Sequence, residues 1–168
     1  IAIGVLGVIT ALAVSALRGF QKEAELTNSA GEVRSIIRLA QNKTVASEDQ
    51  TTYGVFFDTS ALPHEYTLFK GSSYASRVLS FDETHALPDS VEMSGVDFGG
   101  GNEVVFDRIH GTTASPGGLS LRLVSDVTKT SAIYVEDSGK IASASSTAAS
   151  DTGRVKDSRH VHVDYVGR

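Results

Sequence analysis

The 168-residue sequence lacks cysteine and tryptophan altogether. Without cysteine the chain can form no disulfide framework, has no thiol nucleophile and cannot build a cysteine-ligated zinc site. Positive charge is also scarce, since 15 Lys and Arg stand against 20 Asp and Glu, for a formal net charge of -5. This balance argues against a basic nucleic-acid surface over the whole chain.

The short motifs of common catalytic sites are missing as well. No GxSxG nucleophile elbow occurs. The glycines at 99–101 are not followed by the Lys-Ser or Lys-Thr pair of a Walker phosphate loop. The spacing around Asp151 and Asp157 does not match an EF-hand. We therefore expect a protein without catalysis of its own and without a cofactor.

What the sequence does have is an uncharged start, residues 1–17, which ends at Arg18. A transmembrane helix needs roughly 20 apolar residues, so this run lies at the short edge of that class. It is open to three interpretations: a membrane anchor, a secretory signal segment, or a retained helix that packs on copies of itself. The signal segment is the weakest of these, because the helical pattern continues past the small residues at 15–16 that resemble a cleavage site.

Small residues recur along this run at helical spacing. Gly7, Ala11 and Ser15 are four positions apart, and Gly4 adds a further small position. Small residues so placed let helix backbones approach closely in apolar surroundings. We expect these four residues to pack in a filament core, with a plain membrane anchor carrying incidental small residues as the alternative.

Beyond Arg18 the apolar pattern becomes one-sided. Its positions alternate in steps of four and three, which keeps them on one helix face that can pack on a sheet. They are Leu26, Ala30, Val33, Ile37, Ala40 and Thr44. The pattern predicts one helix from residue 1 to about 46, roughly 65 to 70 Å long. Because a small domain is shorter than that, we expect residues 1–25 to protrude as a membrane anchor or filament core and residues 26–168 to form a globular head.

After the helix the rhythm changes to short strands separated by turns. We expect strands at 52–58, 65–70, 77–82, 91–93, 103–108, 119–125 and 130–136. A tight Asp-Ser-Gly turn at 137–139 leads onto Ile141. The Ser- and Ala-rich stretch 142–150 is expected to be a flexible loop, because such side chains bury little surface. Residues 160–166 alternate cleanly and predict a final strand.

An uncharged helix, a helical stripe and then small antiparallel sheets resemble the layout of a type IV pilin-like subunit. The order of the segments 53–55, 66–69, 104–107, 133–135 and 138–141 resembles the minor-pseudopilin branch. That branch is the H-type component of type II secretion and its relatives in type IV pili. The resemblance covers about residues 1–142. It implies an α+β fold, in which a long helix, first hydrophobic and then amphipathic, packs on antiparallel β-sheets.

Members of this family open with an N-methylated aromatic residue and, a few positions later, a glutamate. This sequence starts downstream of both, and we interpret this as a missing start, since about nine more residues complete a normal membrane span. The resemblance implies a structural subunit that leaves the inner membrane with the help of the pilus assembly machinery. It then polymerises through its helix into an extracellular filament on the cell surface. A minor pseudopilin at the tip of a type II secretion pseudopilus is the alternative.

Two clusters in the tail keep a function of another class open, a membrane-anchored metal- or DNA-binding domain. His160, His162 and Asp164 share one face of the expected final strand, and imidazole suits zinc or nickel. The simpler interpretation of this face is an exposed polar surface, and we expect no metal. A second cluster is locally basic and suits DNA phosphates or an adjacent subunit. It contains Arg154, Lys156 and Arg159.

Overall fold

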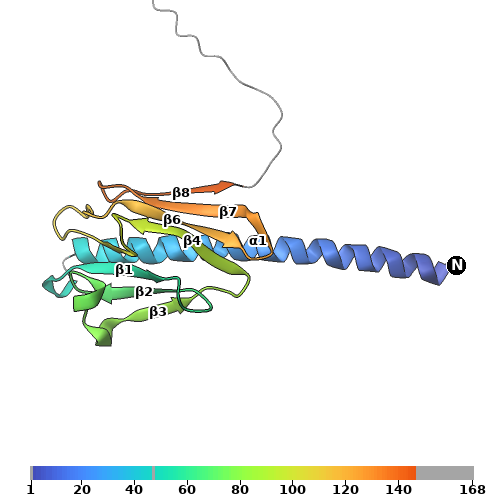
Figure 1. The fold of residues 1–168 in the computed structure, drawn as a ribbon, viewed down its shortest axis with the longest axis horizontal. Helices are drawn as coiled ribbons and strands as arrows, with labels where there is room; N and C mark the ends of the chain where they lie inside the picture. The colour runs from blue at the N-terminus through green and yellow to red at the C-terminus, as the bar shows by residue number, and fades with distance from the viewer. Residues whose placement is uncertain (1, 47, 147–168) are drawn as a thin grey trace, which may run out of the picture.

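The computed structural model of the chain describes residues 2–46 and 48–146 (Figure 1). Within these residues one long α-helix, α1 (Ala2–Val45), precedes all the strands. The eight strands are β1 (Tyr53–Asp58), β2 (Glu65–Lys70), β3 (Glu83–Ala86), β4 (Val91–Phe98), β5 (Glu103–Val105), β6 (Gly117–Leu123), β7 (Asp126–Val135) and β8 (Ile141–Ser146). Three short 3-10 helices connect them: η1 (Glu48–Gln50), η2 (Tyr74–Ser76) and η3 (Leu79–Phe81).

The strands form two antiparallel sheets with the C-terminal half of α1 between them (Figure 1). The first sheet has the order β3-β2-β1-β5, and the second has the order β4-β6-β7-β8. The helix contacts β1 and β2 of the first sheet and β4, β6 and β7 of the second. The apolar stripe of the helix therefore packs against both sheets, and the head has a single hydrophobic core.

The docked half of α1 follows the spacing of its apolar residues. Val33, Ile37 and Ala40 are fully buried between the sheets. At the end of the helix, the Thr44 hydroxyl donates to the Ala40 carbonyl at 2.8 Å and accepts from the Tyr53 backbone N–H at 2.9 Å. This buried hydroxyl ties the last helical turn to the first strand, so the amphipathic half of α1 and the first sheet are joined at that point.

Period-2 alternation accounts for the inner faces of both sheets. In β1, Val55 and Phe57 are buried, and β1 pairs antiparallel with β2, the next expected strand. In the second sheet the buried apolar side chains of β6 and β7 alternate along each strand. They are Leu119, Leu121, Leu123, Ile133 and Val135.

The expected strand at 77–82 is wrong. This segment contains η3 and folds against its own neighbours: the Arg77 guanidinium lies 3.6 Å from the centre of the Tyr74 ring and its Nε donates to Asp82 at 2.7 Å. The Tyr74 ring in turn stacks on Phe56 of β1 at 3.8 Å. These side-chain contacts hold the segment in a turn, and the strand that pairs with β2 is β3, one residue further on.

The expected loop at 142–150 is wrong in its first part. Ala142 to Ser146 belong to β8, which pairs with β7 from Val135↔Ile141 to Thr130↔Ser146. Backbone hydrogen bonds to β7 form this strand, and they do not require large side chains. The rest of that stretch and the expected strand at 160–166 lie outside the described residues.

Candidate interaction surface

The N-terminal part of α1 projects beyond the head (Figure 1). Two polar contacts mark the place where it leaves. Glu23 accepts from the Lys129 ammonium of β7 at 2.7 Å, and the Glu25 carboxylate accepts from the Ser90 hydroxyl just before β4. Leu26 is the first buried residue after them. The segment before these contacts spans roughly 30 Å at about 1.5 Å per residue.

Gly4, Gly7, Ala11 and Ser15 all lie on this projecting segment of α1. The continuous helical backbone puts them on one side of the rod, as the sequence requires for close packing between helices. Their role in a filament core stays a prediction. In the described part of the chain, no helix is sufficiently long and apolar to span a membrane.

The head holds α1 through the residues that the sequence places on its sheet-facing stripe. Its five apolar residues belong to the buried core, and the sixth, Thr44, is fully buried as well. The five are Leu26, Ala30, Val33, Ile37 and Ala40. A buried stripe that enters the core of the head makes the docked half of α1 and the sheets one rigid unit.

A polar contact that the sequence did not reveal fixes the other end of the helix. The Gln41 side-chain amide donates to the carbonyls of Gly111 and Gly139, each at 2.8 Å. These carbonyls belong to the β5–β6 loop and the β7–β8 turn, 70 and 98 residues away in the chain. A Cβ on Gly139 would lie 1.9 Å from the Gly111 carbonyl oxygen, so this close approach requires glycine.

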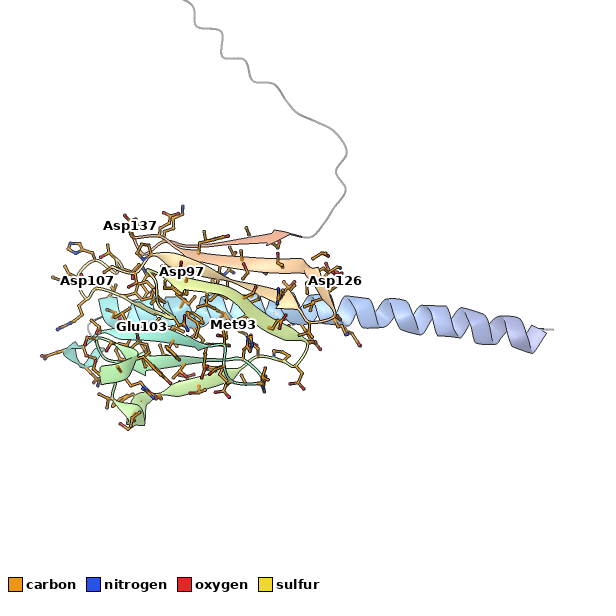
Figure 2. The ribbon with its side chains drawn as sticks, viewed as in Figure 1. Met93, Asp97, Glu103, Asp107, Asp126 and Asp137 are labelled. Atoms are coloured by element: carbon orange, nitrogen blue, oxygen red, sulfur yellow. The ribbon has the colours of Figure 1, made fainter. Side chains whose placement is uncertain are left out.

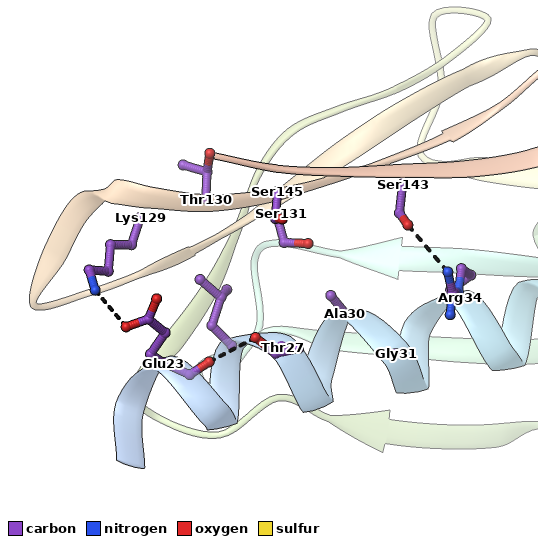
Figure 3. A pocket seen from close by; sticks show the side chains of 11 residues that line it. Glu23, Thr27, Ala30, Gly31, Arg34, Lys129, Thr130, Ser131, Ser143 and Ser145 are labelled. Carbon is purple, nitrogen blue, oxygen red and sulfur yellow. Dashed lines mark hydrogen bonds and ion pairs between the residues drawn. The ribbon is translucent and has the colours of Figure 1, made fainter. Parts of the chain in front are cut away.

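A cavity of about 240 Å³ lies between α1 and the strands β7 and β8 (Figure 3). The charged side chains that line it bind other lining residues. Lys129 forms an ion pair with Glu23, and Arg34 donates to the Ser143 hydroxyl at 3.3 Å. Much of the remaining lining is small or hydroxyl-bearing, including Gly31 and Ser131. These contacts describe a seam between helix and sheet, with no carboxylate pair or nucleophile–base pair among the lining residues.

Three of the four described carboxylates with shifted pKa values accept hydrogen bonds from residues that follow them in the chain. Hydrogen bonds from the Ser60 hydroxyl and backbone lower the pKa of Asp58, and backbone N–H groups of Ile109 and His110 lower that of Asp107. In the same way, the Thr128 hydroxyl and backbone N–H lower the pKa of Asp126. These three shifts have the ordinary cause of a carboxylate that closes a turn, whereas the pKa of Asp49 is lowered mainly by a hydrogen bond from the Lys70 ammonium.

The Tyr66 phenol is the one described group with a pKa clearly raised, to about 12. Burial against the core is the main cause, and the nearby charge of Glu32 acts in the same direction. A buried phenol on a core strand is a packing feature, so this shift does not point to a catalytic acid.

The candidate metal and DNA residues of the tail fall outside the described residues. They are Arg154, Lys156, Arg159, His160, His162 and Asp164. Within 2–46 and 48–146, no group of three or more His, Asp or Glu side chains is placed to hold a metal ion. His64 has a structural role there, because its Nδ1 accepts from the Met93 backbone N–H at 2.9 Å.

Comparison with solved structures gives this arrangement a context. The chain is similar to a structure of the minor pseudopilin EpsH from the type 2 secretion system of Vibrio cholerae, with a TM-score of 0.52 and 9% sequence identity. The match covers 72% of this chain and 97% of that chain. A crystal structure of EpsH matches with a TM-score of 0.47 at 10% identity, over 72% of this chain and 94% of that chain.

No family model and no curated protein matches the sequence. The likeness to the first of the two structures therefore shows the fold. The chain has the type IV pilin-like fold, with an N-terminal helix packed on antiparallel sheets. The α+β class and the pilin-like layout expected from the sequence are confirmed.

Proposed function

We propose that this chain is a structural subunit that assembles through its N-terminal helix into a pilus-like filament. The observation that carries the proposal is the division of α1: its C-terminal half belongs to the head core, while the segment before Lys22 projects from the head (Figure 1). No charged residue occurs in that segment before Arg18. Such a helix needs cover, because exposing apolar area to water costs roughly 25 cal/mol per Å².

Identical copies of the same helix supply that cover. A head-to-tail contact that does not close on itself generates an open helical fibre. In this proposal the projecting helices form the fibre core, the heads form its outer surface, and no catalytic step is involved. Before assembly the helix resides in the inner membrane, and the pilus assembly machinery moves it from lipid into an extracellular fibre.

The likeness to EpsH supports a second form of the proposal, a minor pseudopilin in a type II secretion pseudopilus. Both forms use the same helix and the same head. They differ in copy number, because a shaft subunit repeats along the fibre whereas a tip subunit occurs once. The metal- and DNA-binding alternatives depend on residues 154–164, and no described residue adds support for them.

Electron microscopy of native assemblies, labelled with an antibody against the head, tests the proposal. We expect fibres that contain this chain. Label along the whole fibre supports the shaft subunit, and label at one end supports the minor pseudopilin. A chain that remains a lone membrane-bound monomer, in cells that produce it together with its assembly partners, contradicts both forms.

A further inference from the structure

A groove opens at the end of the head from which α1 emerges. Its volume is about 350 Å³, and its lining includes Leu62 of the β1–β2 loop and Val124 of the β6–β7 turn. Ser90, next to the groove, binds Glu25 of α1 through its hydroxyl and the Val124 N–H through its carbonyl. The groove therefore lies beside the helix at its exit point.

The position of this end is clear in Figure 2. Asp126, the first residue of β7, lies at the end from which the helix projects, and Asp107 lies at the opposite end of the head. Exposed single apolar residues are ordinary on protein surfaces. Leu62 and Val124, however, lie in loops that join strands of different sheets, and both line this one groove, where they are 88% and 54% exposed.

The rim of the groove carries one exposed carboxylate, that of Asp89. The second acidic residue of the lining, Glu92, is half-buried and forms an ion pair with Arg122 at 2.6 Å. Val91, which is buried, adds to the apolar lining. The surface thus combines apolar side chains with the carboxylate of Asp89, which suits an apolar partner that carries a positive charge at one end.

We propose that this groove docks the N-terminal helix of a second copy of the chain. Residues 1–17 supply an uncharged apolar surface, and the first charged residue after them, Arg18, is positive and therefore complementary to the exposed carboxylate of Asp89. The chain's own helix cannot fill the groove, because α1 is continuous from Ala2 to Val45 and leads away from the head (Figure 1).

Copies in a fibre are displaced along its axis. A copy displaced toward the head end, by less than the roughly 30 Å of the projecting segment, brings part of that segment level with this groove. The inference rests on the proposed function and deepens it: the head takes part in the seam, and its exit end covers a neighbour's apolar helix.

Engineered cysteine pairs test the contact directly, because the chain has no cysteine of its own. Chains with Leu62→Cys are assembled together with chains that carry Val5→Cys, Ala11→Cys or Ala16→Cys, and the fibres are oxidised. Disulfide formation needs Cβ atoms about 3.5 to 4.5 Å apart, so it reports close contact. We expect a mixed dimer with at least one helix position in fibres and none in detergent-dispersed monomers.

Ile109 provides the matched control. It is 78% exposed, and its backbone N–H binds Asp107 at the opposite end of the head. Ile109→Cys should form no mixed dimer with the same helix positions. In a second arm, Leu62→Glu should lower the fibre yield about tenfold, since the charge loses water on docking, whereas Ile109→Glu should leave the yield unchanged.

The outcomes separate the two proposals. If the unmodified chain forms no fibre, the proposed function fails and this inference fails with it. If fibres form, but Leu62→Cys links to no helix position and Leu62→Glu assembles as well as Ile109→Glu, only the docking groove is overturned. Both exposed substitutions should leave the thermal unfolding of the head unchanged, which excludes misfolding as the cause of any lost assembly.

Discussion

The two halves of α1 form one continuous helix, but they differ in how charge is distributed around them and in what covers them. The C-terminal half has apolar residues on one side only, and that side is buried between two sheets. The N-terminal half has no charge on any side before Arg18 and projects from the head. The comparison teaches that the distribution of charge around a helix, and not its length, decides which surfaces it needs as partners.

The docked half is satisfied within its own chain. Beyond the apolar stripe, its polar residues contact the head at both ends, through Glu23 with Lys129 and through Gln41 with two loop carbonyls. In the proposed function, the projecting half is covered by other copies of the chain. Substitutions in the two halves should therefore separate head stability from assembly.

The largest effect is expected from bulky side chains on the projecting half. Gly7→Phe combined with Ala11→Phe should abolish fibre formation, because helices that pack through small residues cannot approach each other. The urea-induced unfolding of the head should not change. Sedimentation of assembled material measures the first expectation and fluorescence-monitored unfolding measures the second. Normal fibres from the double variant contradict the predicted core packing.

Next in size is truncation on the docked half. Ile37 is fully buried, so Ile37→Ala should lower the free energy of unfolding of the head by about 2 to 5 kcal/mol. The matched substitution Ile9→Ala, on the projecting half, should change head unfolding by less than about 0.5 kcal/mol. Equal losses from the two variants would mean that the halves of α1 do not differ in the way we describe.

A smaller effect is expected where the docked helix meets the loops. Gly139 has a φ of 79° and no room for a Cβ, so Gly139→Ala should destabilise the head by about 1 to 3 kcal/mol. Gly31 is the contrasting position, because it is helical and a Cβ there meets no atom within 4 Å. Gly31→Ala should stabilise the head by roughly 0.5 to 1 kcal/mol. Thermal unfolding of both variants measures this difference in sign.

Much of the fold follows from local patterns. Alternating steps of four and three predict α1 almost to its last residue, and the rhythm of short strands and turns predicts β1, β2 and most of β6. The strand expected at 77–82 does not form, because Arg77 binds Asp82 and lies over the ring of Tyr74, which stacks on Phe56 of β1. Most of β8 was not predicted, because its pairing with β7 depends on backbone hydrogen bonds. A Ser- and Ala-rich sequence has no apolar alternation that would indicate such a strand.

The surfaces around the helix were harder to predict than the helix. Gln41 binds carbonyls of residues 70 and 98 positions away, and nothing in its local sequence distinguishes it from a solvent-exposed glutamine. The exit-end groove combines Leu62, Val91 and Val124 from three separate segments. Contacts of this kind depend on how the two sheets are placed around α1, and a one-dimensional pattern does not contain that placement.

The smallest expected effect concerns pH, and it again separates the two halves. Residues 1–17 have no titratable side chain, whereas the head contains carboxylates such as Asp58, whose pKa is lowered by the Ser60 hydroxyl and backbone. A carboxylate with a folded pKa below its unfolded value of about 3.8 stabilises the fold above that value. The stabilisation is lost as the pH falls through the folded pKa.

Acid should therefore weaken the head and spare the contacts between projecting helices. Between pH 5 and about pH 3, the unfolding temperature of the head should fall, and Asp58→Asn should make this fall shallower, because the amide does not titrate. Calorimetry of the head, alongside sedimentation of fibres at each pH, measures both expectations. Fibres that dissociate well above the pH at which the head loses stability would show that ionisable head contacts, and not the uncharged helices, hold the copies together.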